Sequence, residues 1–248
     1  MEIEKNKVIA FIPARGGSKG IKDKNVVDLD GIPLIMWSIF AACESDIVDR
    51  IVVSSDSKDI LFSAGFHSRH VCREVELLSR SGELALDSST TESVISDFIT
   101  NDSELKDDDV IILMQPTSPF RYDSLIDRSL KSACGDDFSS FVTVSERSPF
   151  FWKLYNKNGP AKPLYSPKDR KRRQDMRDKD CRFQENGSLY GFVASEYMRC
   201  GHRSPFRTRA VMSDMIHSIE IDTHLDLDFC RSVSQMEVVQ KWKKNIVI

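Results

Sequence analysis

The first half of the chain alternates short apolar runs with helical patterns. Three apolar runs are typical of buried strands, at residues 8–12, 51–54 and 110–114. Helical patterns separate and follow them, at residues 33–43, 58–64, 91–100 and 124–133, and Gly65 is expected to end the second of these helices. This order predicts an α/β fold with a doubly wound, mostly parallel sheet that helices cover on both faces.

Polar side chains stand where each predicted strand ends. Arg15 follows the first strand, Ser-Ser-Asp at residues 54–56 closes the second, and Gln-Pro-Thr-Ser at residues 115–118 follows the third. Ligands of open α/β sheets bind outside the carboxyl ends of the strands. The sequence therefore predicts a binding site on this rim of the sheet.

The loop after the first strand is rich in glycine and has the sequence ARGGSKG at residues 14–20. Glycines let backbone N–H groups approach a ligand closely, and consecutive N–H groups form an anion-binding nest. Positive charge suited to a triphosphate comes from Arg15, Lys19, Lys22 and Lys24. The loop lacks the glycine spacing of both the ATPase P-loop and the dinucleotide site. It therefore predicts a triphosphate-binding turn, with a basic surface turn as the alternative.

The character of the sequence changes after Val144. Aromatic residues cluster at residues 150–155, and a basic run follows at residues 168–173. Because this stretch is too polar for a core, we expect an inserted arm at about residues 146–186 of a single domain that spans residues 1–248. The remaining predicted elements are strands at residues 188–193 and 218–221 and a helix at residues 224–243.

Composition excludes several classes of protein. Lys and Arg total 35 against 38 for Asp and Glu, so the net charge of -3 is unlike that of a dedicated nucleic-acid binder. The six cysteines have no zinc-ligand spacing and indicate thiols in a reducing compartment. No apolar run resembles a signal peptide or approaches the ~20 residues of a membrane span. We expect a cytoplasmic protein that binds neither nucleic acid nor membrane.

Several segments between the first strand and the last helix match the motifs of one family. The most specific are IPARGGSKGI at residues 12–21, followed by Lys24-Asn25, and QPTSPFR at residues 115–121. Others are Arg80 with ELALDSSTTE at residues 83–92, RQD at 173–175, ENGSLY at 185–190 and IEIDT at 219–223. In these segments the chain resembles the acylneuraminate cytidylyltransferases, the CMP-sialic acid synthetases. The resemblance implies a Rossmann-like nucleotidyltransferase fold with an inserted dimerisation arm.

The resemblance also implies roles for individual residues. It assigns catalysis to Arg15, Lys24 and Arg173, the last of which would reach an active site from the arm. It assigns substrate contacts to Ala14, Arg15, Ser18, Asn25, Arg80, Ser89, Thr91, Gln115 and Tyr190, with Gln115 and Tyr190 on the sugar side. Ser89 and Glu92 also have capping-box spacing, so helix capping stays open as a role for Ser89 and Thr91.

A metal site is predicted at Glu220 and Asp222. The two residues are two positions apart in a predicted strand, so both carboxylates point the same way. Paired carboxylates suit Mg²⁺ that is also held by triphosphate oxygens and water. The family usually has two aspartates here, so Glu220 is a departure. Asp226 has the spacing of a capping residue, and we expect it to be structural.

The reaction that the resemblance implies is the transfer of CMP from CTP to the anomeric hydroxyl group of N-acylneuraminate or a related nonulosonic acid, with release of pyrophosphate. The partners are then CTP and an acidic nine-carbon sugar, and the protein is expected to be a homodimer. One alternative is a cytidylyltransferase for another 3-deoxy acid sugar, of the legionaminic or pseudaminic type. A second alternative is a non-catalytic nucleotide-binding regulator.

Overall fold

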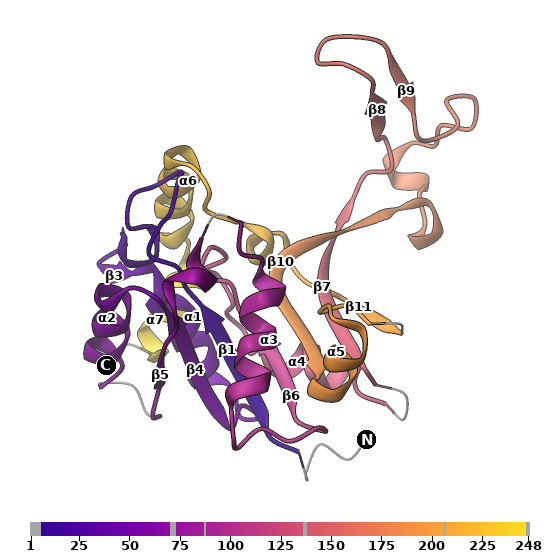
Figure 1. The fold of residues 1–248 in the computed structure, drawn as a ribbon. Coiled ribbons are helices and arrows are strands. Elements are labelled where there is room, and N and C mark those ends of the chain that lie inside the picture. Colours follow the sequence, from indigo (N-terminus) through magenta and orange to yellow (C-terminus); the bar gives the residue numbers. More distant parts are fainter. Residues whose placement is uncertain (1–5, 70–72, 87, 136–137, 206, 247–248) are drawn as a thin grey trace.

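The computed structural model describes residues 6–69, 73–86, 88–135, 138–205 and 207–246. Its centre is a seven-stranded sheet with the order β11-β7-β10-β6-β1-β4-β5 (Figure 1). These strands are β1 (Val8–Pro13), β4 (Arg50–Ser55), β5 (Glu76–Ser79), β6 (Val110–Leu113), β7 (Ser140–Arg147), β10 (Arg182–Val193) and β11 (Thr208–Met212). Neighbouring strands are parallel except where β10 pairs with β6 and β7. The predicted mostly parallel sheet is confirmed.

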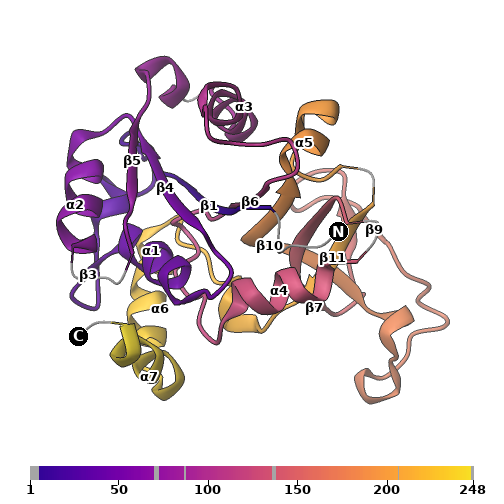
Figure 2. The ribbon, with the colours of Figure 1, turned by 90° about the horizontal axis from the view of Figure 1, so that it is seen from below.

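Helices cover both faces of this sheet (Figure 2). One face carries α3 (Thr91–Asn101) and α5 (Ala194–Cys200). The other carries α1 (Leu34–Glu44), α2 (Lys58–Ser68), α4 (Leu125–Ala133), α6 (His224–Ser234) and α7 (Glu237–Ile246). Because side chains alternate along a strand, Ala10 of β1 packs in the core on the α1 side while Phe11 stacks on Phe98 of α3 with ring centroids 4.5 Å apart.

Two predicted elements near the end of the chain differ from the structure. The strand predicted at residues 218–221 is wrong, because η6 (Met215–Ser218) occupies its start and the loop that follows bonds from Ile221 N–H to the Thr117 oxygen at 2.8 Å. The helix predicted at residues 224–243 is two helices. A turn at Gln235 ends α6, and α7 then folds back so that Trp242 packs against Trp37 at a centroid distance of 5.7 Å.

Helix α2 runs past the end that its glycine predicts. The prediction stops the helix before Gly65, but α2 continues to Ser68. A Cβ atom on Gly65 would lie 2.8 Å from a methyl carbon of Leu77 on β5. This glycine therefore serves close packing of a helix on a strand and does not end the helix.

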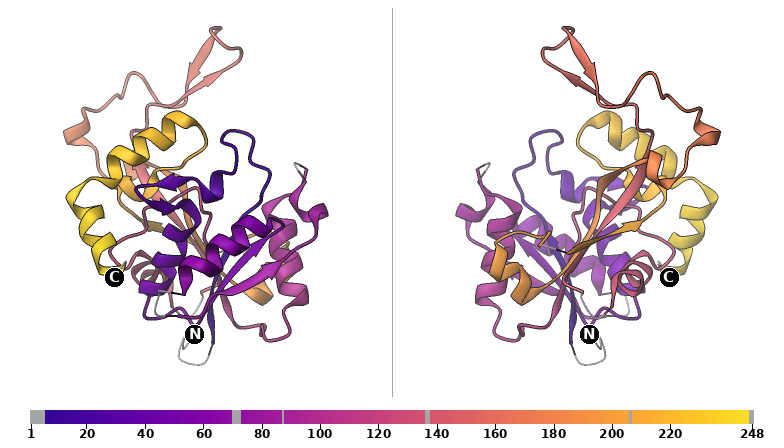
Figure 3. Two further views of the ribbon diagram at one scale, coloured as in Figure 1. Left: turned by 90° about the vertical axis from the view of Figure 1, so that its left-hand side faces the viewer. Right: turned by 90° about the vertical axis from the view of Figure 1, so that its right-hand side faces the viewer.

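Residues 148–181 project beyond the sheet between β7 and β10 (Figures 1 and 3). The two strands still pair with each other beyond a bulge that lies between Glu185 and Tyr190. The projection carries a hairpin of β8 (Trp152–Leu154) and β9 (Ala161–Pro163), followed by η4 (Arg173–Asp175) and η5 (Asp178–Asp180). Trp152 and Tyr155 are more than half exposed.

Three short elements lie close to the sheet. They are η2 (Lys24–Val26), the small hairpin of β2 (Asp28–Leu29) and β3 (Ile32–Pro33), and η3 (Gly82–Ala85). Within the described ranges, no helix has the length and apolar character that crossing a membrane requires.

His217 is buried and makes the stability of the fold depend on pH. Neither ring nitrogen has a hydrogen-bond partner within the described structure, and the ring packs against Tyr122 at a centroid distance of 4.6 Å. Burial lowers the pKa of His217 from 6.5 to about 4. Between these two pH values the unfolded chain binds a proton that the folded chain excludes, so stability is complete above pH 6.5 and falls as the pH is lowered toward 4.

We expect this loss to reach about 3 kcal/mol, since each pKa unit corresponds to about 1.4 kcal/mol. Urea unfolding at several pH values between 7 and 4 gives the free energy of unfolding at each pH and so measures this loss. The variant His217→Asn should lack this part of the pH dependence, whereas His224→Asn, at an exposed histidine of α6, should keep it. Identical pH dependence in wild type and His217→Asn would contradict the assignment.

Candidate active site

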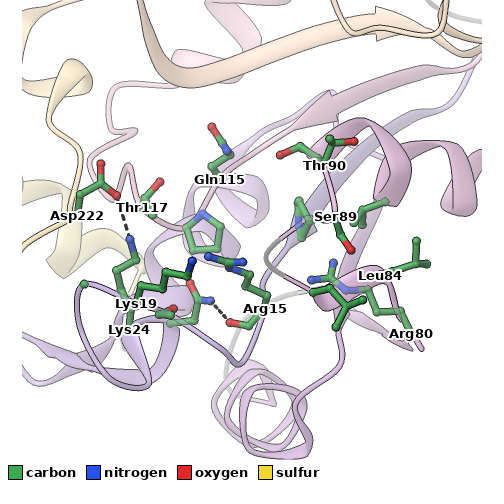
Figure 4. A pocket seen from close by; sticks show the side chains of 18 residues that line it. Arg15, Lys19, Lys24, Arg80, Leu84, Ser89, Thr90, Gln115, Thr117 and Asp222 are labelled. Atoms are coloured by element: carbon green, nitrogen blue, oxygen red, sulfur yellow. Dashed lines mark hydrogen bonds and ion pairs between the residues drawn. The ribbon is translucent and has the colours of Figure 1, made fainter. Parts of the chain in front are cut away.

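A cavity opens at the carboxyl ends of β1 and β6, on the rim where the sequence predicts a binding site (Figure 4). Its volume of about 440 Å³ suits a small-molecule ligand. The loop after β1, the segment from β5 to α3 and the turn after β6 form its walls. Among the residues predicted from the sequence, its lining includes Arg15, Ser18, Lys24, Asn25, Arg80, Ser89, Thr91, Gln115 and Asp222.

Positive charge gathers at one end of this cavity, where the glycine loop meets the segment before α6 (Figure 4). Lys24 Nζ donates to the main-chain oxygen of Ile221 at 2.8 Å and pairs with Asp222 Oδ1 at 3.1 Å. The side chains of Arg15 and Lys19 lie beside Lys24 in the same view. This end is suited to the charge of a triphosphate.

The glycine loop is held by its own hydrogen bonds. The N–H group of Gly16 donates to Asp56 Oδ1 at 3.0 Å, and that of Ser18 donates to the Gly16 oxygen at 3.1 Å. Asn25 Nδ2 donates to the Arg15 oxygen at 2.9 Å. The N–H groups of Gly16 and Ser18 are therefore not available to the predicted anion nest. Side-chain cations then contribute more to phosphate binding than that prediction implies.

Gly20 brings the glycine loop into direct contact with the Asp222 segment. A Cβ atom on Gly20 would lie 2.1 Å from the main-chain oxygen of Asp222, a distance that side chains do not reach. The close approach of the two segments, which allows Lys24 to meet Asp222, thus depends on glycine at this position.

The other end of the cavity combines apolar side chains with hydroxyl groups and a buried arginine. Leu84, Leu86 and Ser89 line it. Arg80 is 9% exposed and bonds the Ser54 oxygen at 3.4 Å, but its Nε has no partner within the described structure. Burial lowers the pKa of Arg80. An unsatisfied buried donor suits a polar ligand atom, such as an oxygen of a base.

The capping role at the start of α3 belongs to Thr90 and not to Ser89. The Thr90 hydroxyl group accepts from the N–H group of Ser93 at 3.1 Å. Ser89 instead donates its hydroxyl group to the Glu83 oxygen at 2.7 Å. The capping role left open for Ser89 and Thr91 thus belongs to Thr90, and both Thr90 and Thr91 line the cavity.

Gln115 stands between the two ends of the cavity (Figure 4). Its main-chain oxygen accepts from Arg121 Nη2 at 2.7 Å. Arg121 is 1% exposed and also donates to the Ser188 oxygen at 2.8 Å and to Ser38 Oγ at 2.9 Å. Burial lowers the pKa of Arg121 to about 9. This arginine supports the turn that presents Gln115, and an arginine so soon after an apolar strand is the signal that could have revealed it.

Glu220 points across Gly187, which has a φ of 70°. A Cβ atom on Gly187 would lie 1.6 Å from Glu220 Oε1, so only glycine leaves room for this carboxylate. Partial burial raises the pKa of Glu220, and the negative charge of Asp222 raises it further. The charge of Asp222 thus acts on Glu220, but the segment is not a strand, so the strand alternation on which the prediction of two aligned carboxylates rests does not apply.

This pair of carboxylates fits a magnesium ion that is shared with phosphate oxygens. Mg²⁺ bound with a triphosphate takes only one or two protein carboxylates and fills its other positions with phosphate oxygens and water. The described residues contain no group of three His, Cys, Asp or Glu side chains that could hold a metal by themselves. Glu220 and Asp222 would thus hold the ion together with its substrate.

Four predicted residues do not line the cavity: Glu220, whose carboxylate lies over Gly187, and Ala14, Tyr190 and Arg173. Ala14 is 1% exposed and its N–H group donates to the Ser54 oxygen at 2.9 Å, so its side chain belongs to the core beneath the loop. Tyr190 is 8% exposed, and burial raises its pKa to about 12. Arg173 begins η4 on the projecting segment, and its side chain lies outside the described part of the structure.

Comparisons with known proteins give consistent matches. The family model described as Cytidylyltransferase matches residues 9–245. N-acylneuraminate cytidylyltransferase of Oncorhynchus mykiss is 34% identical over 226 residues, which cover 90% of this chain and 49% of that protein. N-acylneuraminate cytidylyltransferase B of Danio rerio is 37% identical over 220 residues, with coverage of 88% and 49%. The chain spans about half the length of these curated relatives.

A shorter relative matches along most of its length. CMP-N,N'-diacetyllegionaminic acid synthase of Legionella pneumophila is 29% identical over 227 residues, which cover 89% of this chain and 93% of that protein. Among solved structures, CMP:2-keto-3-deoxy-manno-octonic acid synthetase complexed with CTP has a TM-score of 0.62 at 17% identity and covers 92% of this chain and 98% of its own. That likeness concerns the fold alone.

Proposed function

The chain belongs to the cytidylyltransferase family, and we propose that it transfers CMP from CTP to the anomeric hydroxyl group of an acidic nine-carbon sugar. The observation that carries this proposal is the cavity, whose cationic end adjoins Asp222 and whose other end offers apolar and hydroxyl-bearing side chains. The names of the relatives, which are cytidylyltransferases or CMP-sugar synthases for nonulosonic acids, support CTP and an acid sugar as substrates.

CTP would lie along the cavity with its phosphates at the cationic end. Lys24 and Arg15 then face the triphosphate. The cytosine ring would lie at the other end, where Leu84 offers apolar contact and the Arg80 guanidinium offers a donor. This donor would select for cytosine, because a base that offers Arg80 no acceptor would leave a buried polar group without a partner and would bind less tightly.

The chemical step is an attack of the sugar hydroxyl group on the α-phosphorus of CTP. A bond forms between the sugar oxygen and phosphorus, the bond from phosphorus to the bridging oxygen of pyrophosphate breaks, and the proton of the sugar hydroxyl group passes to water. Negative charge grows on the phosphoryl oxygens and on the leaving pyrophosphate, and Lys24 and Arg15 stabilise it. Gln115 stands between the two ends of the cavity and can orient the attacking sugar.

Magnesium is part of the proposal. Glu220 and Asp222 are the residues that would hold it, and the ion would neutralise charge on the triphosphate and the leaving pyrophosphate. Lys24 keeps Asp222 oriented through their contact at 3.1 Å.

The choice of sugar is proposed between two types. N-acylneuraminate follows from the relatives of Oncorhynchus mykiss and Danio rerio, and a legionaminic acid follows from the relative of Legionella pneumophila. Relatives of both types match at comparable identity, 34% and 37% for the first and 29% for the second, so both types of sugar should be tested together.

The proposed function is tested by incubating the protein with CTP, Mg²⁺ and a panel of nonulosonic acids while pyrophosphate is measured. We expect release with at least one acid sugar and far less with ATP, GTP or UTP. If no sugar supports release while CTP still binds, the protein is a nucleotide-binding regulator and the proposed activity is wrong.

A homodimer and a cytosolic location complete the proposal. Phe151, Trp152 and Leu154 on the projecting segment are exposed, and apolar surface of this kind is typical of an interface. Arg173 lies on the same segment, and in a dimer it would be available to the active site of the partner subunit. The five cysteines that the structure describes are thiols, which supports a reducing compartment.

A further inference from the structure

The first turn of α3 forms one wall of the cavity. Thr90, Thr91 and Val94 all line the cavity, but Glu92 does not. The Glu92 side chain makes its contacts with a segment that follows α5, more than 100 residues later in the chain. Thr91 therefore lines the cavity while its neighbour Glu92 makes contacts outside it. Glu92 can thus hold the first turn of α3 from outside the cavity.

Arg203 is the main partner of Glu92. Arg203 Nε donates to Glu92 Oε1 at 2.7 Å, and the two side chains are only 20% and 32% exposed. Burial is the largest influence and alone would raise the pKa of Glu92, but the bond to Arg203, the Arg203 charge and smaller contributions together outweigh it and lower the pKa. A charged hydrogen bond that is largely shielded from water is stronger than an exposed ion pair.

Tyr197 holds the same residue through its main chain. The Tyr197 hydroxyl group donates to the Glu92 oxygen at 2.7 Å and lies 3.3 Å from Ser96 Oγ. Tyr197 belongs to α5 and is fully buried, so its ring has little freedom to move. Side chain and main chain of Glu92 are therefore fixed by two different residues of one segment.

Arg203 is itself held against the sheet. Its guanidinium carbon lies 4.9 Å from the ring centroid of Tyr190, which is 8% exposed on β10. A cation over an aromatic face is attracted to it, most of all where water is excluded. The position of the first turn of α3 is thereby set relative to β10, which is central to the sheet.

We propose that Arg203, together with Tyr197, is a positioning residue that fixes the first turn of α3 and so sets the affinity of the cavity for the nucleoside half of its ligand. The proposal rests on the proposed function only in taking CTP as that ligand. Arg203 does not line the cavity, and the phosphate end is built from the glycine loop and Asp222. Loss of Arg203 therefore affects one end of the cavity and spares the other.

Calorimetric titration with CTP and with inorganic triphosphate separates the two ends. In Arg203→Met we expect the Kd for CTP to rise about tenfold, a typical size for loss of a positioning contact, with the Kd for triphosphate unchanged. Arg203→Lys, which keeps the charge, should recover part of the affinity. Glu92→Gln in the Arg203→Met background should add little, because both changes remove the same contact.

Arg199→Met is the matched control. Arg199 lies on α5 and pairs with Glu196 at 2.5 Å, within its own helix, and its side chain is 64% exposed. This variant should bind CTP as the wild type does. Equal weakening of CTP and triphosphate in Arg203→Met, or wild-type affinity for both, would overturn the proposal.

Amide hydrogen exchange without any ligand gives an independent reading. The amides from Ser93 to Ile95 should exchange faster in Arg203→Met than in wild type, while those of the glycine loop should not change. If the wild type failed to bind CTP, the proposed function would be wrong, but the exchange data would still decide whether Arg203 positions α3. Unchanged exchange in the first turn of α3 would reject that role.

Discussion

Replacing Gly20 with alanine should lower the rate of pyrophosphate release about 100-fold, since a displacement of about 1 Å in an active site can cost that much. The new Cβ atom would lie 2.1 Å from the Asp222 oxygen and 3.3 Å from its carbonyl carbon. Both obstacles belong to the main chain, so no side-chain rotation relieves the clash. The glycine loop and the Asp222 segment have to separate, and Lys24 loses its contacts with Ile221 and Asp222.

Gly17→Ala is the matched control for this change. Gly17 lies in the same loop, is exposed and does not line the cavity, and a Cβ atom there would meet nothing within 4 Å. Alanine also keeps the N–H group of the glycine. We expect the rate of this variant to stay within about threefold of wild type, as for most surface substitutions. A similar loss in both variants would mean that the whole loop, and not its contact with Asp222, determines the rate.

Asp222→Asn should reduce turnover roughly 1000-fold, the size expected when a main electrostatic contribution to a transition state is lost. A neutral amide oxygen is a much weaker magnesium ligand than a carboxylate, and the pairing with Lys24, at 3.1 Å in the wild type, loses its charge. CTP binding should survive, because Arg15, Lys19 and Arg80 still line the cavity. Pyrophosphate release over a range of Mg²⁺ concentrations, together with CTP titration, measures both effects.

Asp228→Asn controls for the loss of one negative charge near this segment. Asp228 lies on α6, is 68% exposed and pairs with Arg231 at 2.9 Å, so its replacement should leave turnover unchanged. Wild-type turnover in Asp222→Asn would show that the metal assignment is wrong. Loss of all CTP affinity in that variant would show instead that Asp222 maintains the phosphate end of the cavity.

Strands β1, β4 and β6 could be predicted from the sequence, whereas the inner strand β7 and both edge strands could not. β1 and β6 are buried on both faces and almost uniformly apolar, and β4 has a buried apolar run at residues 51–53. β5 and β11 lie at the two edges of the sheet, and most of their residues are exposed or only partly buried. Their sequences are short and combine polar with apolar residues, because an edge strand does not have to be buried on both faces. Such sequences resemble those of loops.

The helices show a similar limit. Periodicity placed α1, α3 and α4 within a residue or two of their observed bounds. Gly65 was misread as the end of α2, because a glycine needed for packing and a glycine that ends a helix look alike in a sequence. The break at Gln235 was missed, since it depends on the packing of Trp242 against Trp37, a contact between distant parts of the chain.

The residues of the candidate site also divide into those that the sequence predicts and those that it does not. Residues that follow a strand or lie in a motif, such as Arg15, Lys24 and Gln115, could be predicted and do line the cavity. Ala14 could not be assigned correctly, because a motif does not show which of its side chains turns into the core. Arg203 belongs to no motif, and its bond to Glu92 spans 111 positions. Contacts of this kind follow from the folded structure and leave no local pattern.

The contact between Lys24 and Asp222 joins positions 198 residues apart. During synthesis on a ribosome, the glycine loop and most strands of the sheet emerge long before Asp222 does. Until then the phosphate end of the cavity lacks Asp222, and in a nascent or truncated chain that stops short of it Lys24 has neither Ile221 nor Asp222 to contact. We therefore expect nucleotide to stabilise chains made at least as far as α6 more than shorter fragments.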